Sequence, residues 1–252
     1  MDNKIVYDCR WSDNVDEKFI DDFNLIQDSV FCSTSTREDF KKQFIDNIYG
    51  PSVVTVVYID EVPSAARALW RNDIDGYKAY QPGRTCVLGN CRGMGIFTEM
   101  TKCSIALLDE NAFIYNFPNN NSFPGYLKMG WHLVKEYRPV FLVRLKNYLK
   151  EHPLQMDATY ANWWVKDVEG IKYIKRGKHY FIVRQHSKRL FYHIISMVEE
   201  DIALLFPKHC AFGLCFYLSE RQTFYNKKIS SLHVVCKNSD IICIPTWKMD
   251  AI

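Results

Sequence analysis

The stretch TCVLGNCRGMGIF, residues 85–97, decides how this sequence is interpreted. It begins with apolar and β-branched residues, which are typical of a strand. It ends where Phe97, Met100, Ile105 and Leu108 begin to recur at helical spacing. A basic turn with two glycines lies between the two patterns. The sequence therefore predicts a strand, a glycine-rich turn and a helix in direct succession.

Such a turn is a candidate anion site. The first backbone N–H groups of a helix have no acceptor within the helix, and the helix dipole favours negative charge at that end. Glycines at positions 93 and 95 let the backbone approach phosphate oxygens, and Arg92 adds a positive charge. A diphosphate is the natural ligand of these groups. The alternative is a turn that only joins a strand to a helix.

Two common nucleotide-binding patterns do not fit this turn. A P-loop requires a lysine after its last glycine, whereas Gly95 is followed by Ile96. A Rossmann turn requires a third glycine where this chain has Thr98. It also requires an acidic residue about 20 positions later, where the next strand carries Tyr115 and Asn116. Both patterns are therefore excluded.

The turn resembles the R/Q-x-x-G-x-G/A loop of the GNAT acyltransferase superfamily, in the form in which the basic residue directly precedes Gly-x-Gly, as in Arg92–Gly95. A second motif of that family, N-x-x-A-x-x-x-Y-x-x-x-G-[FW], resembles N-x-x-S-x-x-x-Y-x-x-x-G-W at residues 119–131. The two motifs follow in the family's order and in its strand and helix setting. The resemblance covers about residues 5–145.

The resemblance implies a fold and a cofactor. The implied fold is α/β (α+β), with a central mixed sheet that is flanked by helices and splayed to admit the pantetheine arm of acetyl-CoA. Strand residues would pair with the pantetheine amides, loop amides would hold the pyrophosphate, and an asparagine would contact the pantetheine end. The residues assigned to the cofactor in this way are Val87, Leu88, Arg92, Gly93, Met94, Gly95, Ile96 and Asn119.

The resemblance also implies direct transfer, in which a neutral amine attacks the thioester carbonyl and the thiolate leaves. The backbone of Leu88 would polarise the thioester oxygen. Tyr126 matches the position that protonates or orients the departing sulfur in many relatives. The alternative for Tyr126 is a tyrosine that packs its helix against the sheet.

The general base is unassigned, because the strand segment 85–88 carries no carboxylate. A water chain is one alternative. Four carboxylates are further candidates, although each is expected to be a solvated turn or helix charge: Glu61, Asp73, Asp75 and Glu99. Cys91 lies within the cofactor loop and is interpreted as a packing residue rather than a nucleophile.

Around this core, periodicity predicts the other elements of the first 150 residues. Strands are expected at 5–11, 52–58, 62–70, 77–88, 113–117 and 132–145, with an interruption at Pro82-Gly83. Helices are expected at about 19–31, 35–49, 96–108 and up to 129. Ser35 and Glu38 form the capping-box pattern of the second helix.

The composition shifts at residues 150–153, so we predict domains at 1–150 and 151–252. The second domain is expected to be smaller and α/β, with strands at 173–183, 211–218 and 232–244 and a helix at 188–206. It has no second Gly-x-Gly loop. Phe181–Arg184, the basic pair Lys188-Arg189 and a helix from Leu190 repeat the strand, turn and helix order, so one hypothesis is a degenerate half of the same fold.

Aromatic residues are frequent in the C-terminal third, although most are expected in the core. They are Trp163, Trp164, Tyr173, Tyr180, Tyr192, Tyr217, Tyr225 and Trp247. Flat faces with polar edges suit sugar rings, so an amino sugar or a related small amine is the hypothesis for the acceptor.

Composition excludes several other classes. The net charge of +3 over 252 residues gives no general reason to bind nucleic acid or membrane. Residues 1–8 lack the apolar core of a signal peptide, and no apolar run reaches the roughly 20 residues of a spanning helix, so the protein is expected to be cytoplasmic. Nine cysteines without CxxC pairs predict reduced thiols, and the seven histidines show no metal-ligand spacing.

The leading hypothesis is therefore a GNAT-type N-acetyltransferase that moves an acyl group from coenzyme A to a small-molecule amine. The alternative is a non-catalytic CoA-binding module with a protein-interaction C-terminal region. Aminoacyl transfer from tRNA on a tandem GNAT scaffold would require a basic face, and the small net charge argues against it.

Overall fold

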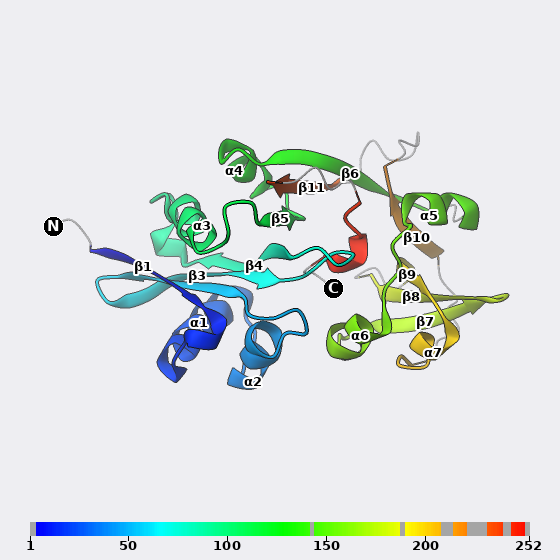
Figure 1. Ribbon diagram of the computed structural model, residues 1–252, viewed down its shortest axis with the longest axis horizontal. Coiled ribbons are helices and arrows are strands. Elements are labelled where there is room, and N and C mark those ends of the chain that lie inside the picture. Colours follow the sequence, from blue (N-terminus) through cyan, green and yellow to red (C-terminus); the bar gives the residue numbers. More distant parts are fainter. Residues whose placement is uncertain are drawn as a thin grey trace. The chain divides into compact units, whose positions relative to one another are not determined.

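The computed structural model describes residues 4–141, 144–186, 190–207, 214–220, 231–238 and 243–249. The chain divides into two compact units (Figure 1). Unit 1 comprises Met1–Asn116, Pro124–His132 and Cys236–Asp240, and unit 2 comprises Phe117–Phe123, Leu133–Val235 and Ile241–Ile252. The division falls before residue 150, because helix α5 (Leu145–Glu151) packs with the strands of unit 2.

Unit 1 is built on a five-stranded sheet in the order β1-β2-β3-β4-β5. The strands are β1 (Ile5–Trp11), β2 (Val53–Ile59), β3 (Val62–Arg71), β4 (Ala79–Val87) and β5 (Phe113–Asn116). Neighbours from β1 to β4 are antiparallel, and β5 is parallel to β4. Val53, Val54, Val56 and Val57 are all fully buried, which shows that both faces of β2 are covered.

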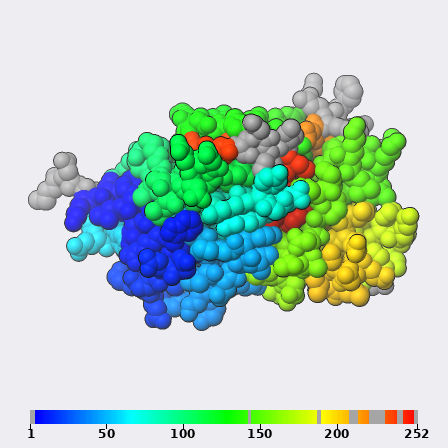
Figure 2. Space-filling view, in the orientation of Figure 1, coloured from blue at the N-terminus to red at the C-terminus, as the bar shows by residue number. Residues whose placement is uncertain are grey.

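Helices cover the two faces of this sheet. On one face, α1 (Glu17–Phe31) lies beside α2 (Arg37–Phe40) (Figures 1 and 2). The ring centres of Phe23 and Phe40 are 5.2 Å apart. On the other face lies α3 (Ile96–Ala106), whose Ser104 hydroxyl is 2.8 Å from Thr55 on β2. The predicted mixed sheet flanked by helices is confirmed.

The cap of α2 differs from the predicted one. Thr36, not Ser35, caps the helix, and the side chain of Asp39 accepts hydrogen bonds from Thr36 in a capping box. The backbone of Ser35 instead donates to Asp28, 2.9 Å away. The helix continues as a π-helical turn, Lys41–Ile45, and stops before residue 49, because Asn47 donates to the carbonyl of Arg71.

The expected irregularity in β4 is a bulge that lies just after Pro82-Gly83. Ala66 pairs with Cys86 and Ala68 with Gly83, so Arg84 and Thr85 together oppose the single residue Arg67. Arg84 has a φ of +50°, a left-handed conformation. The bulge therefore bends β4 just before it reaches the glycine-rich turn.

The prediction that the cysteines are all reduced is wrong for one pair. Cys9 on β1 and Cys103 on α3 form a disulfide, with Cα atoms 6.5 Å apart. The packing of α3 across β1 brings together two residues that are 94 positions apart in sequence. Six other cysteines among the described residues form no disulfide.

Unit 2 contains a second sheet. Its strands lie in the order β6 (His132–Val140), β10 (Leu214–Ser219), β9 (Phe191–Val198), β8 (His179–Gln185) and β7 (Ile171–Arg176). The predicted helix at 188–206 is wrong. Residues 191–198 form β9, which pairs with β8, and among the described residues of this range only α7 (Glu200–Ala203) is helical. The remaining elements are α6 (Ala158–Tyr160), the π-helical turn Ala161–Val165 and β11 (Leu232–Lys237).

The two units share one order of elements. In each, a short helix with a side-chain cap, Thr36 in unit 1 and Asp157 in unit 2, runs into a π-helical turn. Three antiparallel strands follow, then a helix, then a strand parallel to the third strand. The corresponding strand and helix in unit 2 are β9 and α7, not the predicted strand 181–184 and a helix from Leu190, and the degenerate half stays a hypothesis. Lys188-Arg189 and Tyr225 lie outside the described residues.

Candidate functional site

The candidate site begins where β4 and β5 separate. The two parallel strands pair only at Ala79 with Phe113 and at Tyr80 with Ile114. Strand β4 then continues to Val87 without further pairing to β5. The edge of β4 beyond the paired residues therefore has backbone groups that no strand of unit 1 satisfies, which is the predicted splay.

Register decides which backbone groups point into the splay. The N–H of Leu88 donates to the carbonyl of Ser64 on β3, 3.0 Å away, so it already has an acceptor. Opposite residues in an antiparallel pair alternate between hydrogen-bonded and non-hydrogen-bonded, and Val87 faces Ala65 in the next position. The N–H and C=O of Val87 thus point away from β3, and its carbonyl accepts from Arg92 Nε at 3.3 Å. Of the two residues, it is therefore Val87 whose backbone N–H has no partner on β3.

The glycine-rich turn presents free amides. Gly93 and Gly95 have φ of +82° and +76°, which explains why glycine occupies both positions. Gly95 caps α3 without a side-chain hydrogen bond. In the described part of the chain, the N–H groups of residues 93–97 meet no backbone acceptor, and Arg92, Gly93, Met94 and Gly95 are exposed. The exposed turn 92–95 therefore has unpaired amides beside the start of α3, where Ile96 is buried. Backbone donors in this arrangement suit an anion.

A buried arginine lies beneath this region and was not identified from the sequence. Arg67 on β3 is fully buried, and its guanidinium donates to Thr101 Oγ1 on α3 and to the hydroxyl of Tyr126, 2.7 Å away. Its carbon lies 5.2 Å from the ring centre of Phe97. Among the described residues no carboxylate pairs with it, and its Nε has no acceptor. Its only sequence signal was a cation inside an otherwise apolar strand.

Tyr126 is the predicted residue whose surroundings the structure defines best. It lies on α4 (Phe123–Lys128), is 2% exposed, and packs edge-on against Phe97 and Trp131, with ring centres 5.6 and 4.8 Å away. The tyrosine therefore packs its helix, as the alternative hypothesis requires. Because its oxygen accepts from Arg67, its own proton also stays available for donation.

A second buried side chain holds the bulge of β4. Gln27 on α1 is 1% exposed and donates to the carbonyl of Arg84 at 2.6 Å and to the thiol of Cys86 at 3.1 Å. Burial raises the pKa of Cys86 to about 12, so this thiol stays neutral at physiological pH. Gln27 thus fixes the strand that leads into the site.

The other predicted residues have local partners. The Asn119 side chain accepts from the N–H groups of Asn121 and Ser122, each 3.0 Å away, and caps the turn into α4; it belongs to unit 2. Cys91 is buried against Ile96 and Met100, as a packing residue.

None of the four candidate bases has surroundings that distinguish it from an ordinary charged residue of a turn or helix. Glu61 and Asp75 lie exposed at turns with positive φ. Asp73 pairs with Arg71, and Glu99 pairs with Lys102 at 2.8 Å.

Unit 2 repeats the splay without the anion site. Strand β9 pairs with β10 only from Phe191 to His193, and from Ile194 to Val198 its described partner is β8 alone. The next three residues are Glu199, Glu200 and Asp201, where unit 1 has its glycine-rich turn. Three carboxylates at a helix start repel a diphosphate, so this half is not a second site for the same ligand.

Comparison with protein-family models finds no match, and neither does comparison with curated protein sequences. Solved structures share the fold, at low sequence identity. A GCN5-related N-acetyltransferase from Kribbella flavida matches over 91% of this chain and 71% of its own, at 10% identity and a TM-score of 0.53. One from Anabaena variabilis matches over 92% and 72%, at 11% identity and a TM-score of 0.53.

A conserved protein of unknown function from Enterococcus faecalis V583 matches over 96% of this chain and 73% of its own, at 13% identity and a TM-score of 0.54. These similarities span both units of the chain. The fold is therefore that of the GNAT acyltransferases, as the two motifs predicted.

Proposed function

We propose that this protein is a GNAT-type acyltransferase that moves an acyl group from a coenzyme A thioester directly to an amine. The observation that carries the proposal is the row of free amides at residues 93–97, placed directly after the unpaired edge of β4. This arrangement suits a ligand with a diphosphate at one end and an amide-bearing arm at the other, as in acetyl-CoA.

In this proposal the turn from Arg92 to Ile96 holds the diphosphate, and the unpaired edge of β4 faces the pantetheine arm. The Val87 N–H then polarises the thioester oxygen as the acceptor nitrogen attacks the carbonyl carbon. Asn119 is assigned to the pantetheine end, and only the motif resemblance supports this assignment. Positioning of the two reactants supplies most of the rate.

Collapse of the tetrahedral intermediate breaks the carbon–sulfur bond, and the proton for the sulfur comes from the hydroxyl of Tyr126. Arg67 donates to the same oxygen at 2.7 Å and stabilises the negative charge that develops on it. The attacking nitrogen loses its proton to water, which returns a proton to the tyrosine. No side chain is assigned as general base.

The acceptor is proposed to be a small amine, with an amino sugar as the specific candidate. Of the aromatic residues that suggested a sugar, Tyr173, Tyr180, Tyr192, Tyr217 and Trp247 are buried in unit 2. Trp163 and Trp164 stay half-buried and carry the remaining support. In the described residues no helix has the length and apolar character needed to cross a bilayer.

One observation favours the alternative, a CoA-binding module without catalysis: Tyr126 is 2% exposed and no candidate base is distinguished. The test is thiol release from acetyl-CoA with a panel of amines, amino sugars included, for the wild type and Tyr126→Phe. We expect turnover with at least one amine and a loss of 10²-fold or more in the variant, the scale of general-acid catalysis. Tight CoA binding without turnover on any amine would favour the module.

A further inference from the structure

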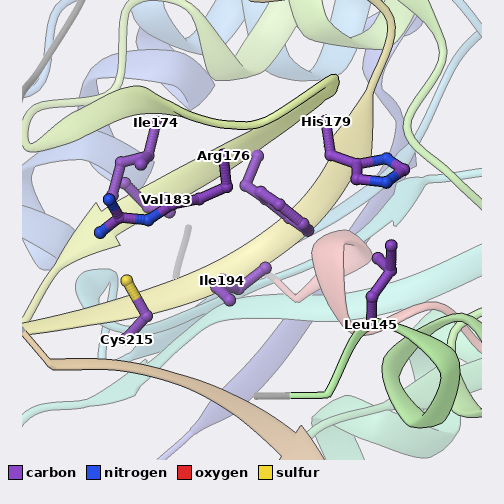
Figure 3. A pocket seen from close by; sticks show the side chains of 8 residues that line it. Leu145, Ile174, Arg176, His179, Val183, Ile194 and Cys215 are labelled. Carbon is purple, nitrogen blue, oxygen red and sulfur yellow. The ribbon is translucent and has the colours of Figure 1, made fainter.

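Unit 2 contains a cavity that has no part in the proposed transfer. Its volume is about 260 Å³, and it lies between the strands of the second sheet and helix α5 (Figure 3). The residues that line it are Leu145, Ile174, Arg176, His179, Phe181, Val183, Ile194 and Cys215. All of them lie in unit 2.

Strand register brings these side chains to one face. Ile174 pairs with Phe181, and Arg176 pairs with His179, on the adjacent strands β7 and β8. Val183 pairs with Ile194 on the next strand, β9. Positions two apart on one strand share a face, so the pairs form successive rows of the same wall. The register of β8 against β9 shifts between Ile182 and Val183, and this bulge bends the wall of the cavity.

The lining is apolar except for three groups. Leu145, Ile174, Phe181, Val183 and Ile194 supply most of the wall. Polar atoms come only from Arg176, His179 and Cys215 among the lining residues. Figure 3 shows the Arg176 guanidinium on the same side of the cavity as Cys215, with His179 on the other side. The cavity therefore has an apolar body and a cationic end.

The cation at that end is hydrogen-bonded to the Cys215 thiol and has no acidic partner among the described residues. Arg176 is exposed, and no carboxylate in the described ranges pairs with it. Burial raises the pKa of Cys215, and Arg176 opposes that rise, so the guanidinium lies close to the thiol. A thiol is a weak acceptor and engages one of the five guanidinium N–H groups, so the others stay available to an anion.

We propose that this cavity binds an aliphatic monocarboxylate of about eight carbons, with its carboxylate on Arg176 and its chain against Phe181, Val183 and Ile194. The size follows from the volume. A protein cavity of about 150 Å³ binds benzene, which has six heavy atoms, so a space of 260 Å³ holds roughly ten, the number in octanoate. Branched aliphatic walls fit an alkyl chain, and a guanidinium fits a carboxylate bidentately.

The test is calorimetric titration of the full chain with octanoate, butanoate, dodecanoate and octanol. We expect one octanoate per chain. Affinity should fall about fourfold per methylene removed, so butanoate, with four methylenes fewer, should bind about 200-fold more weakly. Dodecanoate should gain nothing over octanoate, because the cavity is full. No octanoate binding, or octanol binding as tightly as octanoate, would overturn the proposal.

Variants locate the site. Arg176→Gln should weaken octanoate about tenfold. Lys175→Gln is the matched control, because Lys175 is an exposed cation on the same strand that lies instead over the ring of Tyr180, 4.8 Å away. It should change the affinity less than twofold. Equal effects of the two substitutions would show that general charge, not this cavity, binds the anion, and would refute the assignment.

A chemical readout is independent of both variants. Octanoate should slow alkylation of Cys215 by iodoacetamide at least fivefold, as followed by peptide mass spectrometry. Exposed Cys32 in unit 1 should react at an unchanged rate. Binding without protection of Cys215 would overturn the placement. Because no residue of the proposed transferase site is involved, this outcome is separate from that of the acetyl-CoA assay.

Discussion

Replacement of Arg67 by methionine tests the roles proposed for the buried arginine and for Tyr126. The substitution keeps much of the side-chain length and removes the charge. It deletes hydrogen bonds to Thr101 and Tyr126, each worth about 1.5–3 kcal/mol because the donor is charged. It also removes the desolvation cost of a fully buried cation, which is several kcal/mol. The two terms oppose each other, so the free energy of unfolding should change by less than about 2 kcal/mol.

The effect of the substitution on the rate is not offset by an opposing term. In the variant the charge that develops on the tyrosine oxygen is stabilised by one charge-assisted hydrogen bond fewer. A loss of about 1.5–3 kcal/mol in the transition state lowers kcat about 10- to 150-fold. The assay is steady-state thiol release from acetyl-CoA, paired with urea unfolding of the same preparations. Arg71→Met, on the same strand but paired with Asp73, should leave kcat within twofold.

A double-mutant cycle separates a joint role from two independent ones. If Arg67 acts through Tyr126, the double variant Arg67→Met/Tyr126→Phe should be no slower than Tyr126→Phe alone. A folded Arg67→Met protein with kcat within twofold of the wild type would refute the reasoning. So would losses from the two substitutions that multiply in the double variant.

Three further predictions concern the turn, the disulfide and pH. Gly93→Ala should weaken CoA binding at least tenfold, as measured by calorimetry. Gly76→Ala is the matched control, because Gly76 has a φ of +79° against +82° for Gly93 and equally open space around it. Both variants should lose about 1 kcal/mol of stability, but the control should keep its affinity for CoA, and equal affinities of the two variants would contradict this. Reduction of Cys9–Cys103 should lower the free energy of unfolding by about 2–4 kcal/mol in urea titrations, and an unchanged midpoint would argue against the crosslink. Burial lowers the pKa of His152, so the unfolded chain binds the proton more readily. Stability should therefore fall as pH drops below about 6.5, by up to about 1.4 kcal/mol per unit, and His152→Phe should flatten this slope.

Local sequence patterns were sufficient to predict the glycine-rich turn and the strand and helix on either side of it. The left-handed conformations at positions 93 and 95 are ones that only glycine adopts easily, so glycine at these positions indicates the backbone conformation of the turn. The order of strands around the turn followed from apolar runs and turn residues. The fold of unit 1 could be predicted because each of these signals lies within a few residues of the feature it specifies.

Features that depend on distant partners could not be predicted. Arg67 meets Thr101 and Tyr126 at separations of 34 and 59 residues, and no local pattern marks those contacts. The choice of Val87 over Leu88 depends on the register with Ser64, which one residue of slippage reverses. The same limit applies to the disulfide.

Two errors arose from ambiguous local patterns. Ser35 and Thr36 each stand three residues before an acidic residue, so either could begin a capping box. The side chain of Asp28 settles the register, because it accepts from the N–H of Ser35. In unit 2, residues 191–198 carry enough apolar residues to suit either a helix or a strand. Pairing with β8 decides for the strand.

The central claim is that the free amides at residues 93–97 bind the diphosphate of coenzyme A. Amide hydrogen exchange with and without CoA tests it most directly. We expect protection concentrated in residues 92–99, and much weaker protection from pantetheine, which lacks the diphosphate. Protection by CoA elsewhere in the chain, or equal protection by pantetheine, would contradict it.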